Sequence, residues 1–243
     1  MIFAAGLGTR LRPLTNDRPK ALVEVKGKTL LEHNILKLRD AGFDHLVVNV
    51  HHFGEQIISF LESHQNFGID IRVSDERDLL LDTGGGLRRA LSLFPNDDPV
   101  LIHNVDIVSE ADVAQAYRDH LQSGADATLL VNERKTSRYL SFEPVGEHPS
   151  LRLRGWINIS TGETKGEVRE SFRQKAFSGI HIINQSALAH LKAFTDEPAF
   201  PIMDFYIRSC PSLDIRGSEL PADCRWVDCG KVESLAKAAE ILP

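Results

Sequence analysis

The stretch at residues 1–15 decides the fold, and it reads Met1-Ile2-Phe3-Ala4-Ala5-Gly6-Leu7-Gly8-Thr9-Arg10-Leu11-Arg12-Pro13-Leu14-Thr15. Its five apolar residues predict a buried β-strand, and the glycines after them predict a loop at the carboxyl end of that strand. Gly6 and Gly8 permit positive φ, so successive backbone N–H groups can form an anion-binding nest. Arg10 and Arg12 add donors in the fixed geometry that suits phosphate oxygens. The stretch therefore predicts a phosphate-binding loop.

Two well-known nucleotide loops do not fit this stretch. No Gly-Lys-Ser/Thr follows the glycines, which excludes a P-loop. The dinucleotide fingerprint would need a third glycine, and Pro13 interrupts the helix that it would require. Lys20, in Arg18-Pro19-Lys20-Ala21-Leu22, adds one strong cation after a rigid proline. A solvated basic loop between two elements is the alternative interpretation of this region.

Beyond the loop, short apolar runs alternate with amphipathic segments. We expect strands at 46–50, 69–73, 100–102 and 128–131, and helices at 30–41, 56–61, 86–94 and about 112–122. This alternation predicts βαβ units and a mostly parallel sheet. Later we expect strands at 139–142, 151–159 and 177–183, a charged hairpin or flap at 158–174, and helices at 185–193 and 232–242. The predicted fold class is α/β: one domain, 1–243, with a Rossmann-like doubly wound sheet and a strand-rich second half carrying a lid.

Composition limits the function classes. The chain has 243 residues, 42% of them hydrophobic, which is enough for one large domain with a buried core. Its net charge of -6 argues against a nucleic-acid partner, because nucleic-acid binding needs a broad basic face on the protein. Cys210, Cys224 and Cys229 indicate reduced thiols rather than a disulfide framework. We expect no membrane partner and a cytoplasmic location, because no stretch approaches the ~20 apolar residues of a span; the sequence is silent on oligomeric state.

Two aspartates lie where strands are expected to end. Asp106 follows the strand at 100–102, and Asp228 follows a short apolar run in Trp226-Val227-Asp228-Cys229-Gly230. Either could simply cap the next helix. Together they match the preference of Mg²⁺ for one or two carboxylates completed by substrate phosphates. We therefore expect a magnesium site at Asp106 and Asp228.

A glycine-rich segment, Leu81-Asp82-Thr83-Gly84-Gly85-Gly86, precedes the helix expected at 86–94. Glycines at a helix N-terminus let the backbone come close to a ligand. A flexible loop is the alternative. Glu76, a few residues upstream, could meet the edge of a base.

The phosphate loop, the Arg18–Leu22 segment and Gly27-Lys28 together strongly resemble the sugar-1-phosphate nucleotidyltransferases, over nearly the whole chain. The resemblance implies a Mg²⁺-dependent enzyme that joins a nucleoside triphosphate to a sugar 1-phosphate and releases pyrophosphate. It implies a nucleotide-binding half, about 1–132, and a sugar-binding half, about 133–243. Arg10 would hold the β- and γ-phosphates and Lys20 the α-phosphate, both catalytic. The nucleotide-binding residues implied are Ala4, Ala5, Gly6, Leu7, Gly8, Thr9, Arg10, Lys20, Glu76, Thr83, Gly84 and Gly85.

The sugar phosphate is assigned by the same resemblance. Relatives carry an E-K-P motif where this chain has Glu163-Thr164-Lys165, without the proline. A solvated flap fits this segment equally well. Gly179, in Phe177-Ser178-Gly179-Ile180, would leave room for the sugar ring, and Asn104 completes the expected sugar-phosphate site.

The expected substrates come from a subgroup of that family. The Asp82–Gly86 loop departs from the common L-G-T-A form and, with Val50-His51-His52, resembles the N-acetylmuramate-1-phosphate uridylyltransferases. The expected pair is UTP with N-acetylmuramate 1-phosphate, which would belong to cell-wall metabolism. Alternatives are a mannose- or heptose-1-phosphate guanylyltransferase, a phosphocholine cytidylyltransferase, or a regulatory homologue that binds sugar nucleotide without turnover. A Rossmann oxidoreductase is the remaining rival.

Overall fold

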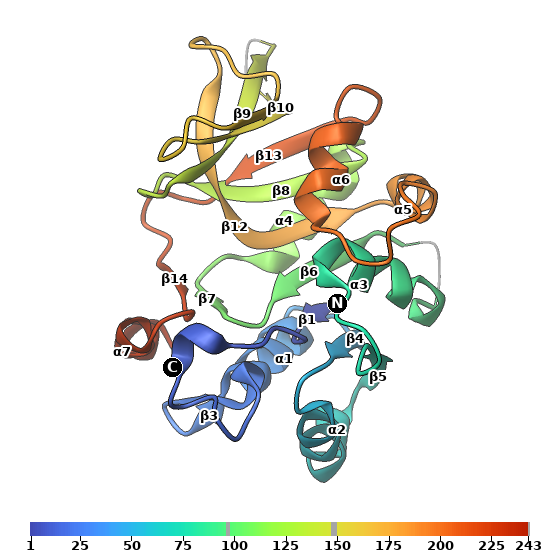
Figure 1. Ribbon diagram of the computed structural model, residues 1–243, viewed down its shortest axis with the longest axis vertical. Helices are drawn as coiled ribbons and strands as arrows, with labels where there is room; N and C mark the ends of the chain where they lie inside the picture. Colours follow the sequence, from blue (N-terminus) through green and yellow to red (C-terminus); the bar gives the residue numbers. More distant parts are fainter. Residues whose placement is uncertain (96–97, 147–149, 243) are drawn as a thin grey trace.

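The computed structural model describes residues 1–95, 98–146 and 150–242. A ten-stranded sheet runs through it in the order β11-β10-β13-β8-β12-β6-β1-β4-β5, and β9 pairs with both β10 and β12. Figure 1 shows this sheet joining a lower half, which holds the blue N-terminal elements, to an upper half built from yellow and orange strands. The two halves therefore share one continuous sheet.

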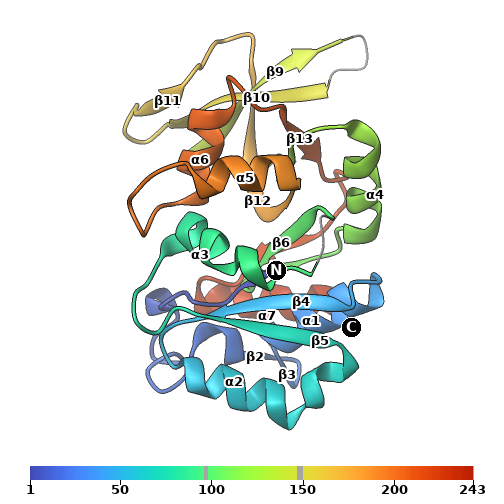
Figure 2. The same cartoon turned by 90° about the vertical axis from the view of Figure 1, so that its right-hand side faces the viewer.

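The lower half is the doubly wound part. Strands β5, β4, β1 and β6 run parallel to one another. Alternate side chains on these strands serve two cores: Phe3 and Val47 pack with α3, whereas Ile2 and Val48 pack with α1, α2 and α4. Figure 2 shows α3 on one side of β4 and α2 on the other. The bounds are β1 Ile2–Phe3, α1 Leu30–Asp40, β4 His45–Val50, α2 Gly54–Ser63, β5 Asp70–Asp75, α3 Asp82–Ala90, β6 Val100–Asn104 and α4 Val113–Ser123.

The upper half is mostly antiparallel. Strand β12 runs antiparallel to β6, β8 and β9, and it joins the two halves of the sheet. One pair, β13 with β8, is parallel. Helices α5 and α6 cover the same face of the sheet in the upper half that α3 covers in the lower half. The bounds are β8 Ala127–Asn132, β9 Arg138–Val145, β10 Ser150–Asn158, β11 Thr164–Gly166, β12 Arg173–Ile183, α5 Gln185–Lys192, α6 Ile202–Ser209 and β13 Ile215–Glu219.

The C-terminal segment returns to the lower half. Strand β14 (Trp226–Asp228) pairs antiparallel with β7 (Ile107–Ser109), and α7 (Val232–Ile241) follows it. Ala238 of α7 packs in one cluster with Leu11 and Leu30, near the short hairpin β2–β3 (Glu24–Val25, Lys28–Thr29). In Figure 1, the dark red α7 accordingly lies beside the blue N-terminal segment. The spatial halves are thus not the two halves of the sequence, because residues 226–241 belong with the first.

Most expected elements are confirmed, one helix begins earlier than expected, and several short elements were not expected. The helix expected at 86–94 begins at Asp82, so the glycine-rich segment forms its first turns instead of preceding it. Helix α6 and strand β13 were not expected. Both are short and have the mixed burial of elements that form by packing against neighbours. In the part of the chain that is described, no helix has both the length and the apolar character to cross a membrane.

Candidate functional site

The phosphate loop starts where β1 ends and folds back over Lys20. The Ala4 N–H donates to Asn49 Oδ1 at 2.7 Å, which fixes the point where the chain leaves the sheet. Gly8 has a φ of +64°, and a Cβ there would lie 3.0 Å from the Cβ of Lys20. The Thr15 hydroxyl closes the loop by donating to Gly8 O at 2.8 Å. Glycine is required at position 8 by its backbone conformation and by this close approach.

Lys20 and Asp106 form an ion pair beneath the loop. The Lys20 ammonium donates to Asp106 Oδ2, and the two side chains are only 10% and 19% exposed. Lys20 lies in the short 3₁₀ turn Lys20–Leu22, and Asp106 lies just beyond the carboxyl end of β6. Little water screens such a pair, so the two charges hold each other in place. Lys20 and Asp106, for which the sequence predicts different roles, are therefore in direct contact.

Strand pairing brings Asp228 to the same place. In the β14–β7 ladder Asp228 lies opposite Ile107, and the N–H of Cys229 donates to Asp106 O at 2.8 Å. Burial raises the pKa of the Cys229 thiol to about 12, and the negative charges of Asp106 and Asp228 add to the rise. Both aspartates therefore lie close enough to the buried Cys229 thiol to interact with it.

Arg10 reaches this cluster over Gly230. A Cβ on Gly230 would lie 2.7 Å from Arg10 Nη2 and 2.7 Å from Asp228 Oδ1. The Gly230 N–H donates to the same Asp228 oxygen at 2.7 Å. The bare glycine thus leaves the space that the guanidinium needs to lie beside Asp228. Arg10, Lys20, Asp106 and Asp228 all converge, as the sequence predicts.

The residues present fit a magnesium ion only with help from a substrate. Among residues 1–95, 98–146 and 150–242, no group of three or more His, Cys, Asp or Glu side chains could hold a metal. Asp106 and Asp228 supply two carboxylates, and the Asp106 carboxylate already forms an ion pair with the Lys20 ammonium. A hard cation held by two carboxylates keeps open positions for phosphate oxygens and water. The donor set therefore suits an ion that arrives with a phosphate ligand.

The expectation that Glu76 meets a base is wrong. Its side chain is fully buried and accepts hydrogen bonds from Asn49 Nδ2 at 2.8 Å and from the Leu81 N–H at 3.4 Å. Burial raises the pKa of the Glu76 carboxyl, and these two hydrogen bonds oppose the rise. Through Asn49, which also binds Ala4, Glu76 connects the phosphate loop to the start of α3. The signal missed in the sequence was a lone polar Asn49 inside the apolar run 46–50.

The glycines of α3 pack closely against the segment before α6, and the nucleotide contact expected of them stays a prediction. A Cβ on Gly84 would lie 2.3 Å from the Phe200 ring, and one on Gly85 would lie 2.3 Å from Pro198 O. The Gly84 N–H donates to Phe200 O at 2.8 Å. The Thr83 hydroxyl accepts from the Ile202 N–H at 2.9 Å and holds the start of α6. Thr83, Gly84 and Gly85 therefore hold the segment before α6 against α3.

Asn104 and Gly179 meet at the join between the halves. Gly179 has a φ of +81° in an irregular stretch of β12, and a Cβ there would lie 2.7 Å from Ile107 and 3.1 Å from Asn104 Nδ2. The glycine is therefore required by its neighbours Ile107 and Asn104, and its role in leaving room for a sugar ring stays a prediction. Beside it, the indole N–H of Trp226 donates to Ser178 O at 2.8 Å. Trp226 in turn lies under the guanidinium of Arg134, a residue that no sequence motif marked.

Glu163 and Lys165 lie apart from this join. Lys165 is on β11 at the outer edge of the sheet, where its ammonium binds Asp204 Oδ1 at 2.9 Å and lies over the ring of Trp156. Glu163 is exposed in the turn before β11. Their sugar-phosphate role stays a prediction, and the contacts described for Lys165 belong to the upper half alone.

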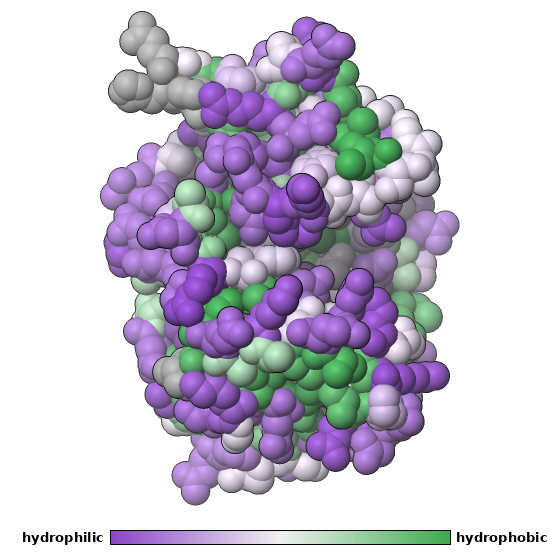
Figure 3. Space-filling model, turned by 90° about the vertical axis from the view of Figure 1, so that its left-hand side faces the viewer, coloured by the Kyte–Doolittle hydropathy of each residue, from purple (hydrophilic) through white to green (hydrophobic). Residues whose placement is uncertain are grey.

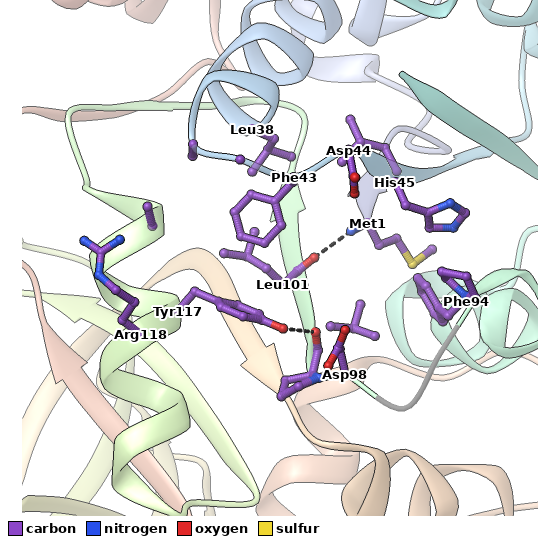
Figure 4. A pocket seen from close by; sticks show the side chains of 17 residues that line it. Met1, Leu38, Phe43, Asp44, His45, Phe94, Asp98, Leu101, Tyr117 and Arg118 are labelled. Atoms are coloured by element: carbon purple, nitrogen blue, oxygen red, sulfur yellow. Dashed lines mark hydrogen bonds between the residues drawn. The ribbon is translucent and has the colours of Figure 1, made fainter. Parts of the chain in front are cut away.

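A cavity away from these residues lies at the opposite end of the parallel strands. It measures about 340 Å³ and is lined by residues that include Met1, His45, Leu101 and Tyr117 (Figure 4). The amino ends of β1, β4 and β6 border it, whereas ligands of such sheets bind beyond the carboxyl ends. Figure 3 shows the face that carries β14 and α7, where hydrophilic side chains surround a hydrophobic patch in the lower half.

Comparison with known proteins agrees with this geometry. Residues 1–143 match the family model described as nucleotidyl transferase. An N-acetylmuramate alpha-1-phosphate uridylyltransferase of Neisseria meningitidis serogroup B is 38% identical over 194 residues, 78% of this chain and 81% of that protein. The protein of the same name from Caulobacter vibrioides is 48% identical over 110 residues, 44% of this chain; this match spans 45% of the Caulobacter protein.

A solved structure shows the same fold. The crystal structure of a UDP-glucose pyrophosphorylase complexed with UDP-glucose superposes with a TM-score of 0.77 at 15% identity, covering 98% of this chain and 95% of that one. The likeness at this identity establishes the architecture. The matched family model covers more than half of the residues, including the whole phosphate loop, Lys20 and Asp106. This chain belongs to the nucleotidyl transferase family.

Proposed function

We propose that this protein joins a nucleoside triphosphate to a sugar 1-phosphate, forming a nucleoside diphosphate sugar and pyrophosphate. The observation that carries the proposal is the convergence of Arg10, Lys20, Asp106 and Asp228 beside the phosphate loop. Two cations, two carboxylates and a backbone nest suit a substrate with several phosphates. Membership of the family supports the same chemistry.

In the proposed reaction the sugar 1-phosphate oxygen attacks the α-phosphorus, and the bond from that phosphorus to pyrophosphate breaks in line. The nucleophile is already anionic, so no general base is needed, and positioning with charge neutralisation carries the catalysis. Arg10 stabilises the leaving pyrophosphate with its planar fork of donors. Lys20 exchanges its contact with Asp106 for the α-phosphoryl oxygens, where charge redistributes in the transition state.

Asp106 and Asp228 would hold the magnesium ion of this reaction. Bound there, Mg²⁺ would neutralise phosphate charge. The ion pair between Lys20 and Asp106 supports this assignment, because it shows a carboxylate already placed against positive charge. When Lys20 turns to the nucleotide, the Asp106 carboxylate is left needing a cation.

UTP and N-acetylmuramate 1-phosphate are the substrates that we propose. The Neisseria and Caulobacter relatives carry that specificity in their names, and the Neisseria match spans most of both chains. A mannose- or heptose-1-phosphate guanylyltransferase and a phosphocholine cytidylyltransferase are the alternatives within the same chemistry. A matrix of four triphosphates against these acceptors, scored by pyrophosphate release with and without EDTA, tests both the reaction and the pair. Turnover that persists in EDTA would falsify the magnesium assignment.

Lys20→Met tests the role given to the lysine. If its contact strengthens in the transition state, kcat should fall by roughly 10²-fold or more, the effect of removing one preorganised charge. The KM for the triphosphate should change much less. Lys237→Met, which removes an exposed lysine of α7, is the matched control and should leave both constants unchanged. An unchanged kcat with a raised KM would show that Lys20 only tethers the nucleotide.

A further inference from the structure

Arg134 is held rigidly at the join between the two halves. It lies in the segment that leaves β8, and the hydroxyl of Tyr139 fixes this segment by donating to Arg134 O at 3.2 Å and accepting from the Thr136 N–H at 3.1 Å. The guanidinium carbon lies 4.6 Å from the centre of the Trp226 ring, and Nη2 donates to Phe177 O at 3.1 Å. A stacked and hydrogen-bonded arginine keeps one orientation.

This cation lacks an anionic partner in the structure. In the described ranges no carboxylate forms an ion pair with Arg134, and its buried Nε–H has no hydrogen-bond partner. Burial lowers the pKa of the guanidinium, whereas the charge of Asp228 acts to raise it, so the aspartate is near enough to interact. A partly desolvated cation with a free donor is costly unless an anion meets it.

The neighbours of Arg134 place it on the acceptor side of the site. Trp226, on which it stacks, is two residues before Asp228 and binds Ser178 O. The Ser178 hydroxyl is itself buried without a partner among the residues described. The next residue, Gly179, lies against Asn104. Arg10 and Lys20 approach from the phosphate loop below, whereas Arg134 and Ser178 belong to the upper half.

We propose that Arg134 binds an oxyanion of the acceptor, with its guanidinium facing either the 1-phosphate or a carboxylate carried on the sugar. The proposal rests on the proposed function and specifies how that site recognises its acceptor. Lys165, the other cation considered for this role, is already engaged by Asp204 on the outer edge of the sheet. Arg134 instead offers a free donor close to Asp228, and its fixed fork suits a carboxylate or phosphate.

The test compares Arg134→Gln and Arg134→Lys with the wild type, using N-acetylmuramate 1-phosphate and N-acetylglucosamine 1-phosphate, which lacks the carboxylate. We expect Arg134→Gln to raise the KM for the muramate acceptor about 10- to 100-fold, as for the loss of a charge-assisted hydrogen bond. The KM for UTP should stay within twofold. A rise in KM confined to N-acetylmuramate 1-phosphate would show that Arg134 binds the carboxylate. An equal rise in KM for both acceptors would show that it binds the 1-phosphate. A change in KM of less than twofold for both acceptors overturns the proposal.

A calorimetric titration of each acceptor into wild type and variants separates this inference from the proposed reaction. If the wild type binds an acceptor without turning it over, and the variants bind it more weakly, the reaction fails and the role of Arg134 stands. Wild type that binds neither acceptor overturns both. Arg208→Gln is the matched control, because Arg208 is an exposed residue of α6 whose guanidinium carbon also lies over an aromatic ring, 4.4 Å from the centre of Phe194. Arg134→Lys keeps the charge and serves if the glutamine variant does not fold.

Discussion

At the level of single residues, Gly230 determines where Arg10 can lie. A methyl group at position 230 would fall 2.7 Å from both Arg10 Nη2 and Asp228 Oδ1. Asp228 is fixed by the Gly230 N–H and by the β14–β7 ladder, so the flexible arginine is the group that must move. The position of the Arg10 guanidinium thus depends on the absence of a side chain at Gly230.

Gly230→Ala should therefore lower kcat/KM for the triphosphate by about tenfold, the cost of displacing one charge-assisted contact. The free energy of unfolding should change by less than about 1 kcal/mol, since an exposed side chain can swing away. Pyrophosphate release and urea unfolding measure the two effects. In an Arg10→Ala background the loss of activity should disappear. An equal loss in both backgrounds would place the damage at Asp228 instead.

Glu76 makes stability depend on pH. Because its pKa is raised in the folded protein, Glu76 binds its proton more tightly there than in the unfolded chain. Its contribution is fully present below the ordinary range of a glutamate and is lost as pH rises through the raised pKa. Glu76→Gln removes the titrating group and with it this fall in stability. The free energy of unfolding of the variant should therefore rise relative to that of the wild type as pH rises over this window. Urea unfolding at a series of pH values measures the difference.

Glu62→Gln, at an exposed position on α2, is the control and should give a difference that does not change with pH. If the Glu76→Gln difference is equally flat, the buried carboxyl does not titrate as we infer. Glutamine keeps the group that accepts from Asn49 but offers no second acceptor to the Leu81 N–H. The variant should therefore start from a lower stability at acid pH.

At the level of secondary structure elements, α3 depends on small residues for its packing. Three consecutive glycines form its first turns, and their missing side chains make room for Phe200, Pro198 and the Glu76 carboxyl. Glycine costs a helix about 1 kcal/mol relative to alanine. Here that cost is outweighed because the connection into α6 packs directly on the helix backbone.

Gly84→Ala should consequently destabilise the protein although alanine favours helix. The added methyl would lie 2.3 Å from the Phe200 ring and 2.8 Å from its carbonyl oxygen. Overpacking of this kind costs about 1–3 kcal/mol. Gly6→Ala is the matched control, because a Cβ at that position meets no atom within 4 Å. Chemical denaturation of both variants decides the point, and equal stability for Gly84→Ala and wild type would contradict it.

At the level of the whole molecule, the continuous sheet should make the two halves unfold together. Strand β12 pairs with β6 below and with β8 and β9 above, so neither half can lose its edge without exposing backbone groups of the other. The chain has two tryptophans. Trp156 lies on β10 in the upper half, and Trp226 lies on β14, two residues before Asp228.

Each tryptophan can therefore report on one region. In Trp156→Phe and Trp226→Phe, the fluorescence transition in urea should coincide with the transition in far-ultraviolet circular dichroism. Comparison is made within each variant, since the loss of the Trp226 hydrogen bond to Ser178 lowers stability by itself. Two separated transitions in either variant would show that the halves unfold as independent units.

The sequence by itself determined the features that depend on neighbouring residues. Alternating apolar runs fixed the βαβ order, and the backbone freedom of Gly6 and Gly8 with the charges of Arg10 and Lys20 marked the phosphate loop. Asp106 and Asp228 were predicted because each follows a strand. The roles of Glu76, Gly84 and Gly85 could not be predicted in this way, because they depend on burial by distant segments.

Contacts between distant segments of the chain determine which of these residues meet. Pairing of β14 with β7 brings Asp228 to Asp106, and an irregular stretch of β12 sets Ser178 and Gly179 against Trp226 and Asn104. Arg134 carries no local signature, and its orientation comes from Trp226 and Tyr139. The physical reason is that periodicity and φ preferences act along the chain, whereas strand register, burial and unpaired charge are set by contacts across it.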